Sequence, residues 1–311
     1  MLKTENRPAP SYAATPRLQP APSNLARLKL LGTLGIILVL CFGTPLYELA
    51  RFARGSDLYS HALLIPFISA YLIWLKRGSF VPGSRPAPWW AMIPVWLGLS
   101  MVALYWIGVH YQWKLEVVDY LFLMTGSFVL LLAGLCLAVL GKTNFAVLVF
   151  PLAMLSFMAP LPALARRWVE TFLQNGSAEA AWLMLKLSGM PVLKAGTYFQ
   201  LPGLSMEVAP ECSGIHSSIV LLISSLLAGQ LLLRSNWSRA VLVLAIVPLA
   251  LLRNGFRIFT LAQLSVQVDR NFIHSDLHHR GGPIFFALSL LPLFLLLWAL
   301  RKWERRFPTQ N

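Results

Sequence analysis

Cys212 is the most reactive side chain that the sequence offers, because of where it stands. It follows Pro210-Glu211 and precedes Ser213-Gly214, at the predicted start of an apolar helix. A helix N-terminus favours the thiolate form of a cysteine. A thiolate is a strong nucleophile for acyl transfer, whereas the alternative is an inert cysteine at a membrane interface. Cys41 and Cys136 lie inside apolar runs, where a thiol packs as a small hydrophobic group.

Two arginines lie within a later apolar segment, in the stretch Arg253-Asn-Gly-Phe-Arg-Ile258. Ionisable residues inside membrane helices are costly and are functional candidates by default. Arg253 and Arg257 are one helical turn apart and therefore share a face. The guanidinium of Arg257 can donate hydrogen bonds to a developing oxyanion or to a substrate carboxylate. The alternative is a structural arginine that pairs with an acid such as Asp269 or extends to the interface.

Histidines supply a proton carrier. The stretch His274-Ser-Asp-Leu-His-His-Arg-Gly-Gly282 contains His274, His278 and His279. Histidine titrates near neutral pH and is the usual proton-transfer partner of a cysteine nucleophile. With Asp276, the same stretch also holds zinc-capable ligands, although their spacing is no standard zinc signature.

Three further histidines are isolated in the sequence. His216 lies one turn after Cys212 and is expected to pack near the site rather than to act in it. His61 and His110 stand alone at predicted helix ends and are expected to be structural. The accessory candidates around the site are Arg253, Asn254, His216 and His279.

The composition places these residues in a membrane protein. Hydrophobic residues make up 57% of the 311 residues and charged residues only 12%, about half the charged share of a soluble domain. The net charge of +14 does not indicate nucleic acid, because the basic residues flank apolar runs instead of clustering. Several of these runs reach about 20 residues, the length needed to cross a bilayer.

We predict an all-α, polytopic bundle of about eight membrane crossings. Residues 1–26 are rich in proline and are expected to be a disordered cytoplasmic tail, 27–303 to be the transmembrane domain, and 304–311 a second cytoplasmic tail. The predicted crossings are about 30–49, 60–75, 89–109, 117–140, 144–160, 213–233, 240–264 and 283–300.

The basic residues predict the orientation. With the N-terminus in the cytoplasm, 15 of the 26 Lys and Arg residues fall on the cytoplasmic side, in agreement with the positive-inside rule. The start of the sixth crossing, the end of the seventh and the start of the eighth then share the outer membrane face. Cys212, Arg257 and His278 lie near these three ends, so residues far apart in sequence are predicted to meet there.

The segment 161–211 is the longest interruption between crossings. Leu164, Trp168 and Phe172 recur every four residues, and a similar pattern resumes after Asn175-Gly176. This pattern predicts two amphipathic helices in the outer interface, with a re-entrant hairpin as the alternative. The residues around Pro202-Gly203 predict a short extended hairpin that leads the chain to Cys212.

Three late elements of the chain resemble the exosortase/archaeosortase family. They are Val208-Ala-Pro-Glu-Cys-Ser-Gly-Ile215, Asn254-Gly-Phe-Arg-Ile258, and His278 followed by Gly282. Further similar stretches include Tyr59-Ser-His-Ala-Leu-Leu-Ile-Pro66, and the resemblance covers about residues 30–300. The combination of the three elements in this order is specific, whereas each element alone is weak.

The resemblance implies a membrane-embedded cysteine protease or transpeptidase without a cofactor. It assigns Cys212 as nucleophile, Arg257 as transition-state stabiliser and His278 as proton donor, with the neighbouring His279 as a competing choice. The implied partners are exported proteins with a C-terminal sorting signal of the PEP-CTERM type, which is a motif, an apolar helix and a basic cluster. Two further implied partners are the lipid bilayer and the exopolysaccharide or biofilm machinery. The implied location is the cell (inner) membrane.

Two other functions compete with this one. The histidine cluster His274–His279 would serve a metal-dependent membrane hydrolase or transferase. A transporter or an assembly scaffold would need no chemistry, but it would require polar residues near the middle of the spans, which are almost purely apolar here.

Overall fold

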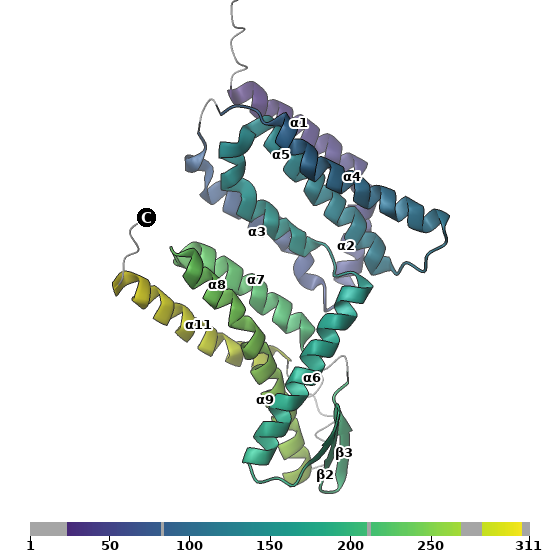
Figure 1. The fold of residues 1–311 in the computed structure, drawn as a ribbon, viewed down its shortest axis with the longest axis vertical. Helices are drawn as coiled ribbons and strands as arrows, with labels where there is room; N and C mark the ends of the chain where they lie inside the picture. Colours follow the sequence, from purple (N-terminus) through teal and green to yellow (C-terminus); the bar gives the residue numbers. More distant parts are fainter. Residues whose placement is uncertain (1–23, 82–83, 210–212, 269–281, 307–311) are drawn as a thin grey trace, which may run out of the picture.

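The computed structural model describes residues 24–81, 84–209, 213–268 and 282–306. Figure 1 shows two groups of helices that lie one above the other. The upper group contains α1 to α5, and the lower group contains α6 to α9 and α11 together with a small β-sheet. Most helices in both groups follow one common direction, as expected for a bundle that crosses a bilayer, whereas α6 crosses that direction (Figure 1).

The upper group is built around α5. Its helices are α1 (Asn24–Cys41), α2 (Gly43–Arg54), α3 (Ile65–Leu75), α4 (Pro88–His110) and α5 (Val117–Leu155), with short 3-10 turns η1 (Ser60–Leu63), η2 (Arg77–Ser79) and η3 (Ser156–Met158). Ile65, Leu72 and Leu121 are almost fully buried in its core. The predicted first crossing is bent by 66° between α1 and α2, so it is not one straight helix.

The helix α5 reverses direction at Gly141. This residue has φ 75° and ψ 171°, a backbone conformation that residues other than glycine rarely adopt. Asp119, near the start of α5, accepts a hydrogen bond from the backbone N–H of Ala163 at 2.8 Å, just beyond its end. Both ends of α5 therefore lie together, and the two predicted crossings 117–140 and 144–160 correspond to the two arms on either side of Gly141.

The described residues include five helices that are long and apolar enough to cross a membrane, or six if the bent pair α1 and α2 counts as one. The long run Val117–Met158 counts once among them, and α3 is apolar but shorter. The chain is therefore a mostly helical, polytopic membrane protein. The total of eight crossings stays a prediction.

The lower group corrects the prediction for segment 161–211. One continuous helix, α6 (Ala163–Leu187), replaces the two amphipathic helices that were expected to break at Asn175-Gly176. A Cβ on Gly176 would lie 2.8 Å from Leu251 Cδ2, so this glycine serves close packing between helices instead of a break. The sequence alone could not separate these two uses of glycine.

A three-stranded antiparallel sheet follows α6, with β1 (Leu193–Ala195), β2 (Tyr198–Leu201) and β3 (Leu204–Glu207) in that order. Leu201 pairs with Leu204 across the turn at Pro202-Gly203, where the sequence predicts the hairpin. The strand β1 was not predicted. Phe199, on β2, is only 1% exposed and joins a hydrophobic cluster with α6 and α9, which fixes the sheet to the helices.

The last helices are α7 (Ile215–Leu232), α8 (Asn236–Leu244), α9 (Ile246–Gln267) and α11 (Gly282–Arg306). The helix α7 begins two residues later than expected, and the predicted seventh crossing is divided into α8 and α9 at Ala245. The helix α9 packs against α6 with both chains running in the same sense, since Gly176 faces Leu251, Ala180 faces Gly255 and Gln263 donates a hydrogen bond to Ser188. Small residues allow this close approach.

We expect Gly255→Ala to destabilise the protein, because the new Cβ would lie 2.6 Å from Ala180 Cβ and 3.1 Å from Ala181 N. Overpacking of this kind costs about 1–3 kcal/mol. Gly35→Ala in α1 is the matched control, since its Cβ would meet nothing within 4 Å. Thermal unfolding in detergent should show a lower midpoint for Gly255→Ala alone. Equal midpoints for wild type and Gly255→Ala would contradict the tight α6–α9 contact.

Candidate functional site

Two of the three late sequence elements, the one that contains Cys212 and the one that contains Arg257, meet at Gly214. It precedes α7 with φ 75° and ψ 18°, a left-handed conformation that suits glycine. Arg253 Nη2, on α9, donates a hydrogen bond to the carbonyl oxygen of Gly214 at 3.2 Å. A Cβ on Gly214 would lie 2.6 Å from Arg253 Nη2 and 3.1 Å from Asn254 Cγ. The segment that follows Cys212 is therefore seated directly on the α9 arginine-asparagine pair.

Arg253 is the most deeply buried cation of this site. Its exposed fraction is 8%, and its Nη1 atom has no hydrogen-bond partner among the described residues. Arg257 lies one turn further along α9, is half-buried, and interacts electrostatically with Arg253. The sequence predicts Arg253 as an accessory residue, and the structure gives it a direct contact with the Cys-Ser-Gly element.

His216 lies in the first turn of α7 and is half-buried. It interacts electrostatically with Arg253 on α9 and with Asp57, which belongs to the loop between α2 and η1. His61, in η1, also interacts electrostatically with His216. Three segments that are far apart in sequence thus bring titratable side chains within electrostatic range of His216.

The position of His61 corrects the prediction that this histidine is isolated. Leu58 belongs to the same loop and packs in one hydrophobic cluster with Ile215 of α7 and Ala250 of α9, which holds the loop against the site. The likeness of residues 59–66 to the family was the sequence signal for this loop, but a single histidine has no spacing pattern that assigns it to a site. His110 is exposed at the end of α4, beside the ring of Tyr111.

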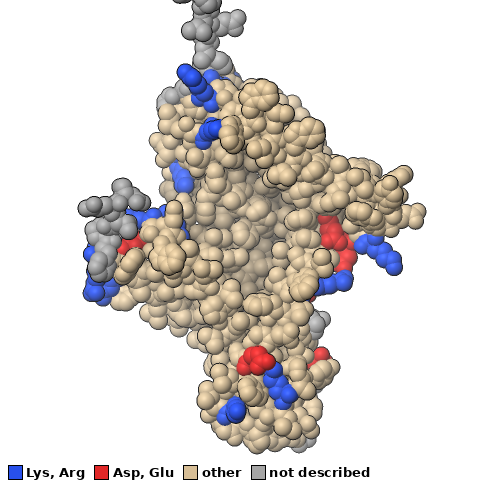
Figure 2. Space-filling model, in the orientation of Figure 1, with Lys and Arg blue, Asp and Glu red and all other residues tan. Residues whose placement is uncertain are grey.

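Ionic contacts fix the neighbouring end of α6. Arg166 and Arg167 both pair with Glu116, at 3.7 Å and 2.7 Å, and Arg166 also lies 3.8 Å from Glu170. Burial raises the pKa of the nearby Tyr59 phenol, and the Arg166 guanidinium opposes that rise. Figure 2 shows acidic and basic side chains mixed around the parts of the molecule that contain α6 and the sheet, whereas the opposite edges carry mainly basic side chains.

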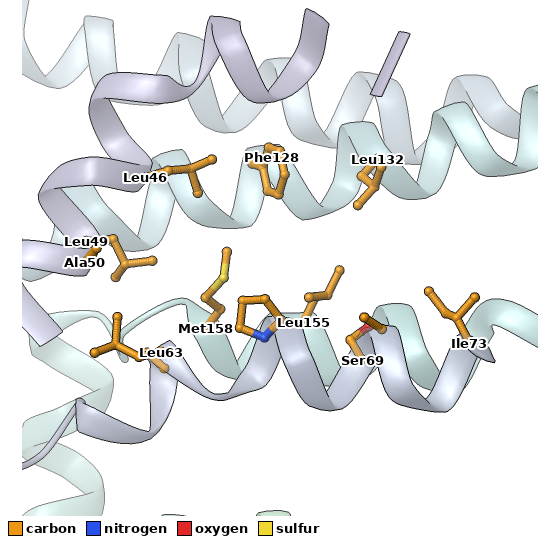
Figure 3. A pocket seen from close by; sticks show the side chains of 13 residues that line it. Leu46, Leu49, Ala50, Leu63, Ser69, Ile73, Phe128, Leu132, Leu155 and Met158 are labelled. Carbon is orange, nitrogen blue, oxygen red and sulfur yellow. The ribbon is translucent and has the colours of Figure 1, made fainter. Parts of the chain in front are cut away.

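An apolar cavity of about 430 Å³ lies between α2, α3 and α5, as Figure 3 shows. Ala62 and Leu63, which follow His61, form part of its wall. Ser69 contributes the one hydroxyl in the lining, and this hydroxyl donates a hydrogen bond to the carbonyl of Pro151 at 2.7 Å. The cavity can therefore hold an apolar group, but its lining contains no titratable side chain.

Several predicted site residues lie outside the described residues, namely Cys212, His274, Asp276, His278 and His279. Within the part of the chain that the structure describes, no group of three or more His, Cys, Asp or Glu residues could hold a metal ion. Because the histidine stretch lies outside that part, the metal alternative is untested. Cys41 is exposed and Cys136 is buried, and neither lies in the cluster described above.

The fold and the site define a polytopic helical membrane protein with a polar cluster where α7, α9 and the loop 55–64 between α2 and α3 meet; this loop contains η1 and is called the η1 loop. The model of the transmembrane exosortase family (Exosortase_EpsH) matches residues 50–295, so the chain belongs to that family. This confirms the resemblance that the sequence elements indicate. Exosortases are known as membrane cysteine transpeptidases that process sorting signals. No curated protein and no solved structure matches the chain.

We expect Gly214→Ala to lower the processing of a sorting-signal substrate by roughly 10²-fold, the scale expected when a site is misplaced by about 1 Å. The new Cβ would displace Arg253 or Asn254. Gly196→Ala is the matched control, because Gly196 has φ 63° and nothing within 4 Å of its Cβ position. Both variants carry the same left-handed strain, of roughly 1–2 kcal/mol. If the two variants processed the substrate equally, the contact of Gly214 with Arg253 and Asn254 would not be needed for activity.

Proposed function

We propose that this exosortase is a membrane-embedded cysteine protease or transpeptidase that cleaves C-terminal sorting signals of the PEP-CTERM type from exported proteins. The observation that carries the proposal is the seating of Gly214 on Arg253 and Asn254, within the three-element pattern of the family. Buried donors beside the segment that follows a cysteine suit acyl transfer, because negative charge develops on the carbonyl oxygen during attack.

In the proposed reaction, the Cys212 thiolate attacks the scissile carbonyl and forms a carbon–sulfur bond. The Arg257 guanidinium donates hydrogen bonds to the resulting oxyanion. The carbon–nitrogen bond then breaks, and His278 gives its proton to the leaving amine. Water or an acceptor amine releases the acyl group from sulfur and regenerates the thiol.

The packing of α11 supports a role for the segment that precedes it. Phe285 of α11 contacts Phe256 of α9, with ring centroids 6.2 Å apart in a T-shaped arrangement. Phe256 is the neighbour of Arg257, so the start of α11 lies beside the arginine turn. We assign the proton to His278 instead of His279 because His278 stands four residues before Gly282, as in the family pattern.

The proposed orientation has both termini in the cytoplasm and the site at the opposite membrane face. The mainly basic side chains at the top and left of Figure 2 support cytoplasmic ends there, and the mixed charges at the right and bottom support the other membrane face. The exposed apolar side chains of Leu164, Trp168 and Phe172 on α6 fit contact with lipid at the interface.

The nucleophile is tested by substitution of each cysteine. We expect Cys212→Ala to leave the protein inserted in the membrane but to abolish cleavage of a reporter that the wild type cleaves, because covalent catalysis requires the thiolate. Cys41→Ala and Cys136→Ala should cleave at nearly the wild-type rate. Cleavage is measured as the shift of the reporter on a gel. Wild-type cleavage by Cys212→Ala would exclude the thiol mechanism.

The orientation is tested by labelling single cysteines in a background that carries Cys41→Ala, Cys136→Ala and Cys212→Ala. Ser205 on β3 and Ser79 in η2 are both exposed. We expect Ser205→Cys to react with a membrane-impermeant maleimide in intact spheroplasts, and Ser79→Cys to react only after lysis. The reverse pattern would place the sheet in the cytoplasm. The segment 175–178 is unsuitable for a fusion, because Ser177 and Ala178 are fully buried.

A further inference from the structure

The apolar cavity between α2, α3 and α5 is elongated, because α3 lines it with one long stripe. Pro66, Ser69, Ala70 and Ile73 stand at spacings of three and four residues on α3, which places them on one side of the helix. This stripe runs for about 10 Å, given a rise of about 1.5 Å per residue. Figure 3 shows the labelled α3 side chains facing those of α2 and α5 across the cavity. The cavity therefore extends along α3.

The lining selects an apolar ligand. Its one hydroxyl, that of Ser69, already donates to the carbonyl of Pro151 at 2.7 Å. All lining residues belong to the described part of the chain, and none of them is titratable. A polar ligand would lose its hydrogen bonds to water in this cavity without any replacement. The ligand must therefore be a hydrocarbon group.

The volume distinguishes the two hydrocarbon-rich occupants that a membrane supplies, an acyl chain and a transmembrane helix. A helix with its side chains is about 10 Å across, so a length of about 10 Å takes up roughly 800 Å³. A cavity of about 150 Å³ holds the ring carbons of benzene, so the cavity of about 430 Å³ holds roughly 17 carbon atoms. One acyl chain fits this space, and a helix does not.

The cavity opens to the side of the helical bundle along α3. Pro66 and Ala70 belong to its lining and are exposed, whereas Phe128, Leu155 and Met158 in its other walls are buried. The helix α3 is apolar, and the surroundings of an exposed apolar helix in a membrane bundle are lipid. An acyl chain can therefore enter the cavity directly from the bilayer.

The C-terminal end of α3 has the features of a membrane–water interface. Tyr71 and Trp74 are exposed, and their rings stack with centroids 5.9 Å apart. The Arg77 guanidinium lies 4.4 Å from the centre of the Trp74 ring, and Lys76 precedes Arg77 in the chain. Aromatic side chains gather at the level of the lipid headgroups, and basic side chains there attract phosphate. Ile73 lies one turn before this end, so the cavity begins just below the headgroup level.

We infer that the cavity between α2, α3 and α5 binds one acyl chain of a phospholipid whose phosphate lies beside Lys76 and Arg77. The other end of the cavity is closed by Leu63 and Met158. Leu63 belongs to the η1 loop, whose Leu58 packs against α7 and α9, so the bound lipid supports the loop that borders the site. This inference goes beyond the proposed function and does not depend on it.

Photolabelling in phosphatidylglycerol vesicles tests the site. A small share of the lipid carries a diazirine on one acyl chain, and the labelled residues are identified by mass spectrometry after illumination. Label on Phe128, Leu155 and Met158 is diagnostic, because these residues are buried and lipid at the outer surface of the bundle does not reach them. We expect label on these three residues in the wild type.

Ala70→Phe should reduce this label at least about fivefold, because the larger side chain fills the opening of the cavity. Ala103→Phe is the matched control, since Ala103 is also exposed in an apolar helix, α4, but does not line the cavity. It should be labelled like the wild type. The thermal midpoint of each variant in detergent shows that it is folded.

The phosphate position is tested by Lys76→Gln combined with Arg77→Gln. We expect label on the three buried residues to fall about three- to tenfold, because two charges that attract the phosphate are lost. Arg305→Gln combined with Arg306→Gln removes the same charge from the exposed end of α11 and should have no effect.

Absence of label from the three buried residues in the wild type would overturn the inference, as would equal label in the wild type and Ala70→Phe. Wild-type label in the Lys76 and Arg77 double variant would overturn the placement of the phosphate. Labelling of the same three residues by a photoreactive group in the apolar helix of a sorting-signal reporter would assign the cavity to the substrate and overturn the lipid site. The proposed function would stand in every case, since the cleavage assay with Cys212→Ala tests it separately.

Discussion

A guanidinium buried in an apolar helical bundle requires hydrogen-bond acceptors, and Arg253 has one in the carbonyl of Gly214. This contact joins α9 to the segment before α7, and it requires a residue without a side chain at the contact point. The rest of the site follows from it. Ser213 is the neighbour of Gly214 in the chain, His216 lies in the first turn of α7, and Arg257 lies one turn further along α9.

The contact depends on the position of α9, and the close packing of α9 against α6 determines that position. Gly255 separates Asn254 from the Phe256-Arg257 pair, and its backbone lies against Ala180 and Ala181 of α6. In a membrane, helices associate through close packing of small residues, because lipid provides little hydrophobic force between them. The same short stretch of α9 therefore carries both the packing surface and the site residues, and displacement of one displaces the other.

The η1 loop connects the two helical groups at the site. Leu58 packs between α7 and α9, while Ala62 and Leu63 line the apolar cavity of the upper group.

The sequence by itself determined the membrane class, the apolar segments, the β2–β3 hairpin and the family, because length, hydropathy and ordered motifs are local properties of the chain. It also predicts that Cys212, Arg257 and His278 meet at one membrane face, since the ends of successive crossings alternate between the two faces. Only the tertiary structure decided that α6 is continuous and that His61 joins the site. A glycine that breaks a helix and a glycine that permits close packing look alike in sequence, and a lone histidine acquires a role only from distant residues that the fold brings to it.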